Sequence, residues 1–179
     1  MNQTSNNLLE IKNLDISFIQ ARGTAHALRG IDLSIAPGEI LALVGESGSG
    51  KTVTAMSVMG LVPAPPARIN AGSLLFKGDE LIGRPHAEMR NIRGNEIAMV
   101  FQEPAKYLNP SLKIGEQITE MLILHLGLSK RQAVEKALEY LDVVGLGKSR
   151  RVLNAYPHEL SGGMKQRDMI AMAICCNPS

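Results

Sequence analysis

Apolar and polar residues alternate in two short stretches near the start of the chain. The stretch LDISF at 14–18 and the stretch IDLSI at 31–35 both place an apolar residue at every second position. This period of two is typical of a β-strand with one buried face and one exposed face. The intervening ARGTAHALRG (21–30) is rich in turn-forming residues, so we predict a strand, a turn-rich connection and a second strand.

Two later apolar runs are continuous instead of alternating. APGEILALVG places a Pro-Gly turn before the run Ile40–Val44, and EIAMVFQEP contains the run Ile97–Phe101. Continuous apolar strands are typical of parallel sheets that are buried on both faces. Between the two runs, GSLLFKGDEL (72–81) predicts a hairpin arm that turns at Lys77-Gly78-Asp79. These patterns indicate an α/β fold in which an antiparallel sheet meets a parallel core.

The apolar period becomes helical in two parts of the chain. TVTAMSVMGLV after Lys51 predicts a short helix that stops near Gly60, because three prolines follow closely. From about 113 to 144 the period is again helical, and Ser129 with Gln132 predicts a capping box. One apolar face of this second region continues as far as Gly145. The face consists of Val134, Ala137, Leu138, Leu141 and Val144.

Composition and charge describe an ordinary globular chain. With 179 residues, 45% of them hydrophobic and 20% charged, the chain can bury one good core. The formal net charge of +2 comes from 19 basic and 17 acidic residues without a long run of one sign. That balance argues against a nucleic-acid-binding arm, and we expect no nucleic-acid partner.

Cysteine usage and hydropathy bear on the compartment. Cys175 and Cys176 are adjacent within an apolar helical stretch, which predicts buried free thiols in a reducing compartment. The first residues, MNQTSNN, lack the pattern of a signal peptide, and no apolar run approaches the ~20 residues of a spanning helix. We therefore expect a cytosolic chain whose link to any membrane goes through a partner.

The strongest motif is GESGSGKT at 45–52, which fits G-x-x-x-x-G-K-[ST]. Its glycines allow backbone N–H groups to converge on phosphate oxygens, and the following helix presents its positive end to the anion. Lys51 would reach the β- and γ-phosphates, and the Thr52 hydroxyl would ligate Mg²⁺. The predicted nucleotide-binding residues of this P-loop are Gly45, Glu46, Ser47, Gly48, Ser49, Gly50, Lys51 and Thr52.

Four features follow one another in an order that identifies a family. The P-loop precedes Gln102 at a strand end, then a helical insert, then LSGG (160–163) opening a helix. This order resembles ATP-binding-cassette (ABC) ATPases over essentially the whole chain. VGESGSGKT, AMVFQEP with LNP, and YPHELSGGMKQR with IAMA look like the ATP-binding subunits of bacterial di- and oligopeptide importers. That group also includes nickel and glutathione importers.

The resemblance implies a P-loop NTPase of the ABC type in which the sheet is incomplete within this span. It also implies an antiparallel β subdomain, a P-loop core and a helical subdomain that carries the signature motif LSGG. These three parts would occupy 1–38 with about 72–82, then 39–62 with 95–104, and about 112–176, respectively.

The cofactors implied by the resemblance are ATP and Mg²⁺. Lys51 and Gln102 would be catalytic residues, and the amide oxygen of Gln102 would approach Mg²⁺ and the attacking water. The metal ligands would be Thr52 and Gln102. Phe18 would occupy the place of the aromatic that stacks on adenine, although it is equally consistent with a core-facing strand residue.

The resemblance also implies partners. Ser161, Gly162 and Gly163 would bind the nucleotide held by the P-loop of a second ATPase subunit in a head-to-tail dimer. The alternative is that Ser161 is only a helix N-cap. The helical insert would dock on transmembrane permease subunits, which work with a solute-binding protein, or its apolar faces would be pure core. The protein would lie peripherally on the cytoplasmic face of the bacterial cell membrane.

Three positions depart from the family pattern. Met164 stands where many members have Gln, and EPAKYLNP replaces the commoner EPMTSLNP in the loop expected to face the permease. Asp168 stands where an apolar residue is usual, in a helix whose other residues predict a buried core helix. The residue pattern offers no physical account of Asp168.

The catalytic carboxylates of the family are missing from the pattern. No apolar strand ends directly in Asp-Glu, and Asp142, the nearest lookalike, lies in a helical stretch. Members of the family also have a histidine, the switch histidine, on a further strand after the Asp-Glu pair. The four histidines of this chain all precede the place expected for it. We therefore expect residues 1–179 to bind ATP-Mg without turnover, as a fragment of a translocating ATP hydrolase that powers import of peptides or related solutes.

Two alternatives to that function stay open. An ABC ATPase of DNA repair or translation would require a long coiled-coil or basic insertion, and the helical insert is too short and too neutral for that. The other alternative is a nucleotide-binding module that does not hydrolyse ATP.

Overall fold

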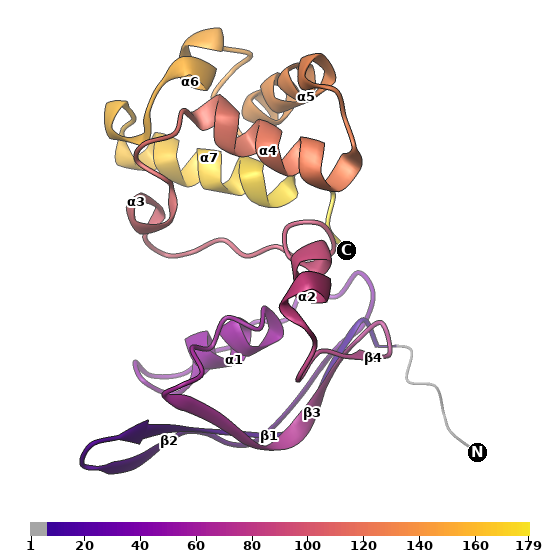
Figure 1. The fold of residues 1–179 in the computed structure, drawn as a ribbon, viewed down its shortest axis with the longest axis vertical. Helices are drawn as coiled ribbons and strands as arrows, with labels where there is room; N and C mark the ends of the chain where they lie inside the picture. Colours follow the sequence, from indigo (N-terminus) through magenta and orange to yellow (C-terminus); the bar gives the residue numbers. More distant parts are fainter. Residues whose placement is uncertain (1–6) are drawn as a thin grey trace. The chain divides into compact units, whose positions relative to one another are not determined.

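The computed structural model describes residues 7–179. They form two compact units, one ending at Met89 and the other spanning Arg90–Ser179 (Figure 1). The first unit contains a sheet and the helix that follows the P-loop, and the second is helical. The elements, in order, are β1 (Leu9–Gln20), β2 (Gly23–Ile35), α1 (Lys51–Val58), β3 (Ala67–Phe76), β4 (Asp79–Glu80), α2 (His86–Ile92), α3 (Pro104–Tyr107), α4 (Ile114–Leu126), α5 (Lys130–Val143), α6 (Arg150–Asn154), the 3₁₀ helix η1 (Pro157–Glu159) and α7 (Gly162–Ile174).

The sheet of the first unit is antiparallel, with strand order β2-β1-β3-β4. Its buried face carries Ile11, Leu14, Ile16 and Leu74, each with at most 1% of its surface exposed. The two predicted strands are present but longer than predicted. The prediction of a turn-rich connection over 21–30 is wrong, because only two residues separate Gln20 from its cross-strand partner Gly23. The pairing of β1 with β2 contains register shifts, and these interrupt a strict period of two, so the sequence pattern does not show a strand in that segment.

The local predictions around the P-loop helix and the hairpin are confirmed. Helix α1 ends at Val58, and Gly60 follows with a φ of 58°. The hairpin of β3 and β4 turns through Lys77 and Gly78, both in left-handed backbone conformations with φ of 52° and 86°.

The two predicted parallel strands are not formed, and these predictions are wrong. Residues 40–44 have no strand assignment, and Ile40 and Val44 are 98% and 89% exposed. Residues 97–101 form only one isolated bridge, between Arg93 and Ile97. A parallel strand requires a neighbouring strand to take up its N–H and C=O groups, and within residues 7–179 no strand pairs with either run.

The second unit has a core made by α4, α5 and α7, which lie together in Figure 1. Ala137 and Leu141 of the predicted apolar face are fully buried. The other three members of that face pack against the same core, so the predicted face is confirmed. The buried core residues are Leu108, Ile114, Ile118, Leu122, Ala133, Ala137, Leu141, Val152, Leu153, Leu160, Ala171, Cys175 and Cys176.

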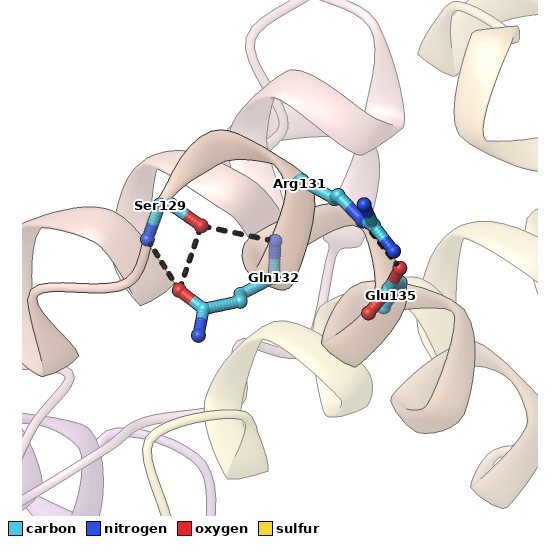
Figure 2. Close-up of polar contacts among 4 residues, drawn as sticks. All are labelled: Ser129, Arg131, Gln132 and Glu135. Atoms are coloured by element: carbon cyan, nitrogen blue, oxygen red, sulfur yellow. Dashed lines mark hydrogen bonds and ion pairs between the residues drawn. The ribbon is translucent and has the colours of Figure 1, made fainter.

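The start of α5 is held by the predicted capping box, shown in Figure 2. The Gln132 N–H donates to the Ser129 hydroxyl at 3.4 Å, and the Ser129 N–H donates to the Gln132 side-chain oxygen at 3.0 Å. Arg131 and Glu135, one turn apart, form an exposed ion pair of 3.2 Å. The cap supplies partners for amide groups that a helix end leaves free, so the prediction of this helix start is confirmed.

The two cysteines lie at the end of α7. Both are buried and free, with 3.8 Å between their sulfur atoms, as predicted. Burial is the main cause that raises the pKa of Cys175 to about 12, so its thiol stays protonated at neutral pH. Among residues 7–179, no helix combines the length and the apolar character needed to cross a bilayer.

Candidate functional site

Lys51 closes the P-loop onto itself. Its ammonium group donates to the carbonyl oxygens of Gly45 and Glu46 at 2.7 and 2.6 Å, and to the Ser49 hydroxyl at 3.2 Å. These three bonds use all three N–H donors of the lysine. The charge of Lys51 therefore sits at the centre of the loop, where a phosphate group would need a cation.

Local geometry requires one P-loop glycine, Gly50, and leaves little room at a second, Gly45. A Cβ added at Gly50 would lie 2.7 Å from a methyl carbon of Leu28 and 2.8 Å from the carbonyl oxygen of Ala27, and Gly50 has a φ of 94°. A Cβ at Gly45 would lie 2.7 Å from the Ser49 hydroxyl. At Gly50 the loop therefore approaches β2 more closely than a side chain would allow, whereas at Gly45 the Ser49 side chain could move aside.

The start of α1 offers free donors. The N–H of Thr54 bonds to the carbonyl of Gly50, while within residues 7–179 the N–H groups of residues 51–53 donate to no protein acceptor. The first turn of α1 contains no acidic residue that would oppose an anion. Free amides and the positive end of the helix dipole together favour a bound phosphate here.

The predicted metal ligands are Thr52 and Gln102, and the Thr52 side chain is exposed at the start of α1. In the described part of the chain, no cluster of three or more His, Cys, Asp or Glu side chains is arranged to hold a metal ion. Mg²⁺ commonly binds through one or two protein groups together with substrate phosphates and water. A hydroxyl beside a phosphate cradle fits that mode of binding.

Phe18 lies on β1 in the first unit, opposite Ala25 of β2 and Ala67 of β3. Its side chain is half-buried. Ala25 is two residues from Ala27, whose carbonyl meets the P-loop at Gly50. A half-buried aromatic ring is consistent with both interpretations of Phe18, and stacking on adenine stays a prediction.

The signature residues open α7 in the second unit. Ser161 is the N-cap, and its hydroxyl accepts a hydrogen bond from the Met164 N–H at 3.3 Å. Gly162 and Gly163 are exposed, and no heavy atom of the described chain lies within 4 Å of a Cβ added at either. Their N–H groups donate to no acceptor within residues 7–179. The capping role of Ser161 is thus present, alongside two free amides that suit an anion.

Gln102 lies in an exposed segment that is fastened to the signature helix. The N–H of the preceding Phe101 donates to the sulfur of Met169 on α7 at 3.2 Å. The Phe101 ring stacks on that of Tyr107, with 3.7 Å between centroids, although Tyr107 is 54% exposed. Phe101, the residue before Gln102, is therefore held by α7 and stacked on Tyr107, while the Gln102 side chain stays exposed to solvent.

The chain does contain one Asp-Glu pair, and the structure gives it a structural role. Asp79 and Glu80 form β4, and the Glu80 carboxylate accepts from the N–H groups of Leu74 and Ile82, both at 2.9 Å. Asp79 forms an ion pair with Arg84 at 3.4 Å. These carboxylates stabilise the hairpin.

The predicted site residues divide between the two units. Phe18 and the P-loop belong to the first, and Gln102 belongs to the second together with the signature residues 161–163. Sequence reasoning missed the contact of Gly50 with Leu28 and the stacking of Tyr107 on Phe101. The sequence offered no signal for either contact beyond an aromatic residue in the loop 103–110, because contacts outside a regular helix or strand spacing leave no periodic pattern.

Comparison with known proteins identifies a family and named relatives. Residues 28–179 match the family described as ABC transporter. The oligopeptide transport ATP-binding protein OppD of Bacillus subtilis (strain 168) is 48% identical over 171 residues, which cover 96% of this chain and 48% of that protein. The dipeptide transport ATP-binding protein DppD of the same organism is 44% identical over 171 residues, covering 96% of this chain and 51% of that protein. The chain spans about half the length of the curated relatives it matches.

A solved structure shares the fold. It is the dimeric post-hydrolysis state of an ATP-binding cassette bound to ADP and Pi, with a TM-score of 0.83 and 28% identity, over 95% of this chain and 70% of that one. The α/β fold with an antiparallel sheet and a helical part is therefore that of an ABC ATPase cassette. The family match covers far more than half of the sequence, and the chain belongs to the ABC transporter family.

Proposed function

We propose that this chain is the nucleotide-binding part of an ATP-hydrolysing subunit of an ABC importer for peptides or related small solutes. The observation that carries the proposal is the P-loop, where Lys51 is centred among the carbonyls of Gly45 and Glu46 beside the free amides of α1. The names of the relatives, oligopeptide and dipeptide transport ATP-binding proteins, support the peptide class of solute.

Each P-loop group has a defined task in this proposal. When ATP binds, the Lys51 ammonium exchanges loop carbonyls for phosphate oxygens, which are stronger, charge-assisted acceptors. The free amides at the start of α1 hold the same phosphates from the backbone. Thr52 would hold Mg²⁺, with Gln102 as its second protein ligand, and the ion would neutralise charge that develops on the phosphates. Gln102 would also orient the attacking water, and Phe18 would stack on adenine.

The proposed partners follow from the two phosphate-binding surfaces. The amides of Gly162 and Gly163 would bind the γ-phosphate of ATP held by a second ATPase subunit, in a head-to-tail dimer. The solved relative bound to ADP and Pi is itself a dimer. Permease subunits and a solute-binding protein would complete the importer, with this subunit peripheral on the cytoplasmic face of the bacterial cell membrane.

ATP binding is tested by titrating the purified 179-residue chain with ATP-Mg in a calorimeter. Lys51→Ala removes a cation that would bond phosphate, so affinity is expected to fall about 10- to 100-fold, because a hydrogen bond to a charged group contributes about 1.5–3 kcal/mol. Lys148→Ala is the control, since Lys148 is an exposed lysine outside the P-loop. Equal affinities of the two variants would contradict the proposal.

Transport is tested in the cell that carries the gene. Uptake of a labelled tripeptide is expected to stop with Lys51→Ala and to continue with Lys148→Ala. If ATP binding requires Lys51 while peptide uptake does not change, the nucleotide site stands and the peptide class is wrong.

A second candidate function is ATP binding without turnover by residues 1–179 alone. It is favoured by Asp79 and Glu80, the one Asp-Glu pair, which are engaged in the β-hairpin. The expected result is ATP binding with negligible phosphate release by the purified chain. Lys51-dependent phosphate release would refute this candidate.

A further inference from the structure

Asp168 is the one buried polar side chain of the described residues whose oxygen atoms lack any hydrogen-bond partner. It lies on α7 with 0% of its surface exposed. The other buried polar side chains are satisfied. Gln117, for example, accepts from the Asn109 N–H and donates to the carbonyls of Asn109 and Leu112.

The position of Asp168 on α7 explains its burial. Met164, Ala171 and Cys175 lie four residues before, three after and seven after it, which places all four on one face of the helix. These three neighbours belong to or pack against the core of the second unit. A carboxylate at this position is therefore held against apolar side chains, where its charged form loses the solvation that water would supply.

Within residues 7–179, Asp168 forms no hydrogen bond or ion pair that would compensate for this lost solvation. Helix α7 packs against α3, α4 and α5. On α3, Lys106 is exposed and paired with Glu103. The acidic side chains of α4 and α5 are all exposed. The other titratable side chains on these elements are all half-buried or exposed, namely Tyr107, His125, Lys130, Arg131, Lys136 and Tyr140.

The remaining titratable groups belong to α7 or its end. The Arg167 guanidinium donates to the Gly145 carbonyl, and Lys165 is half-buried. The thiols of Cys175 and Cys176 have pKa values raised by burial, so they are neutral below pH 8. Burial alone raises the pKa of Asp168, to about 7, in agreement with a carboxyl group that meets no compensating charge.

We propose that Asp168 is a pH-dependent switch for the signature helix. In its protonated form the carboxyl is a small neutral group that the core tolerates, and α7 stays packed. Loss of the proton leaves an uncompensated charge in that core and weakens the packing of α7. The first residues of the same helix are Gly162 and Gly163. The two exposed amides of the signature motif therefore lie on the helix whose packing depends on the protonation of Asp168. This inference rests on the second unit alone and is independent of the proposed function.

The sign of the effect follows from linkage. A free Asp has a pKa of about 3.9, below the raised folded-state pKa of about 7. Between these two values the folded chain binds one more proton than the unfolded chain, so stability falls as pH rises. The stabilisation is fully present below about pH 4, and its loss is complete above about pH 7.

The test compares the full 179-residue chain with Asp168→Asn, in urea unfolding at pH 5 to 8. The asparagine keeps the shape of the side chain and cannot ionise. From pH 5 to pH 8, the ratio of the wild-type unfolding constant to that of Asp168→Asn is expected to rise about 100-fold. Asp142→Asn is the matched control, because Asp142 is an exposed carboxylate in the same unit, and its ratio is expected to stay constant.

Two local measurements complete the test. The ¹³Cγ resonance of Asp168 is expected to titrate near pH 7. Amide exchange in α7, corrected for intrinsic rates, is expected to be faster at pH 8 than at pH 5 in the wild type but not in Asp168→Asn. A carboxyl that titrates below pH 5, or equal pH dependence of the wild type and Asp168→Asn, would overturn the proposal.

Discussion

The two glycine-rich segments that we propose to bind phosphate are built differently. Gly50 of the P-loop has a left-handed φ of 94° and lies where a Cβ would collide with Leu28 and the Ala27 carbonyl. Gly162 and Gly163 of the signature motif begin an ordinary helix with open space around them in the described structure. The fold of the chain requires the first glycine and does not require the other two. If the signature glycines are needed, the reason lies in a ligand that approaches them.

The P-loop and the signature motif also differ in how their lysine and serine side chains are bonded. In the P-loop, Lys51 and Ser49 are bonded to each other and the loop is closed on itself. In the signature motif, Ser161 caps the helix, and the backbone N–H of Lys165 donates to the Ser161 carbonyl. The P-loop is thus a complete cradle within one chain. The signature motif presents donors outward, as half of a composite site would.

The largest effect is expected for Gly50→Ala, which tests whether the P-loop glycine is structural. A side chain at this φ, pressed against Leu28, should destabilise the first unit by about 1–3 kcal/mol. Urea unfolding followed by circular dichroism measures the loss. Gly38→Ala is the matched control, because Gly38 has a φ of 76° but no described heavy atom within 4 Å of an added Cβ.

The difference between these two variants isolates the close contact from the backbone strain. Equal losses for Gly50→Ala and Gly38→Ala would mean that the contact with β2 contributes nothing. The P-loop glycine would then differ from the signature glycines in conformation only.

A smaller effect is expected for Ser161→Ala, which separates the two roles of the signature serine. Loss of the N-cap hydrogen bond to Met164 should cost about 1 kcal/mol in the stability of the second unit. ATP binding to the P-loop of the isolated chain should be unchanged. Denaturant unfolding and calorimetry report the two quantities separately.

Ser161→Asp sharpens the same test, because an aspartate caps a helix as well as a serine but carries negative charge. Its stability should match the wild type. If Ser161 faces a partner's γ-phosphate, ATP-driven dimerisation of the complete subunit should be lost in Ser161→Asp. Normal dimerisation of that variant would leave Ser161 with the capping role alone.

Elements defined by neighbours in sequence were the ones that could be predicted. The cap formed by Ser129 and Gln132 and the apolar face ending near Gly145 depend on residues three or four apart. The runs 40–44 and 97–101 depend on strands elsewhere, and their apolar composition predicts a strand only where such partners pair with them.

The candidate site divides in the same way. GESGSGKT predicts Lys51 and the P-loop glycines because a single short segment builds the whole cradle. The burial of Asp168 follows from the packing of α7 against three other helices, and a period in one helix indicates only that its face is inward. The sequence therefore shows that an aspartate occupies an inward-facing position of the helix, which is unusual. Only the structure shows that, within residues 7–179, its carboxylate oxygens have no hydrogen-bond partner.

The smallest effect, and the one of opposite sign, is expected for Gly163→Ala. Alanine has a higher helix propensity than glycine, and the added methyl group meets no described neighbour within 4 Å, so the second unit should gain about 0.5 kcal/mol. Urea unfolding of the isolated chain measures this gain. In the complete subunit the same methyl group would stand between the free amide of Gly163 and a partner's nucleotide, so ATP-driven dimerisation should weaken while the fold becomes more stable. If Gly163→Ala is destabilised, Gly163 is a structural residue like Gly50, and the contrast between them fails. If the variant is stabilised and dimerises normally, Gly163 is dispensable, and the contrast fails as well.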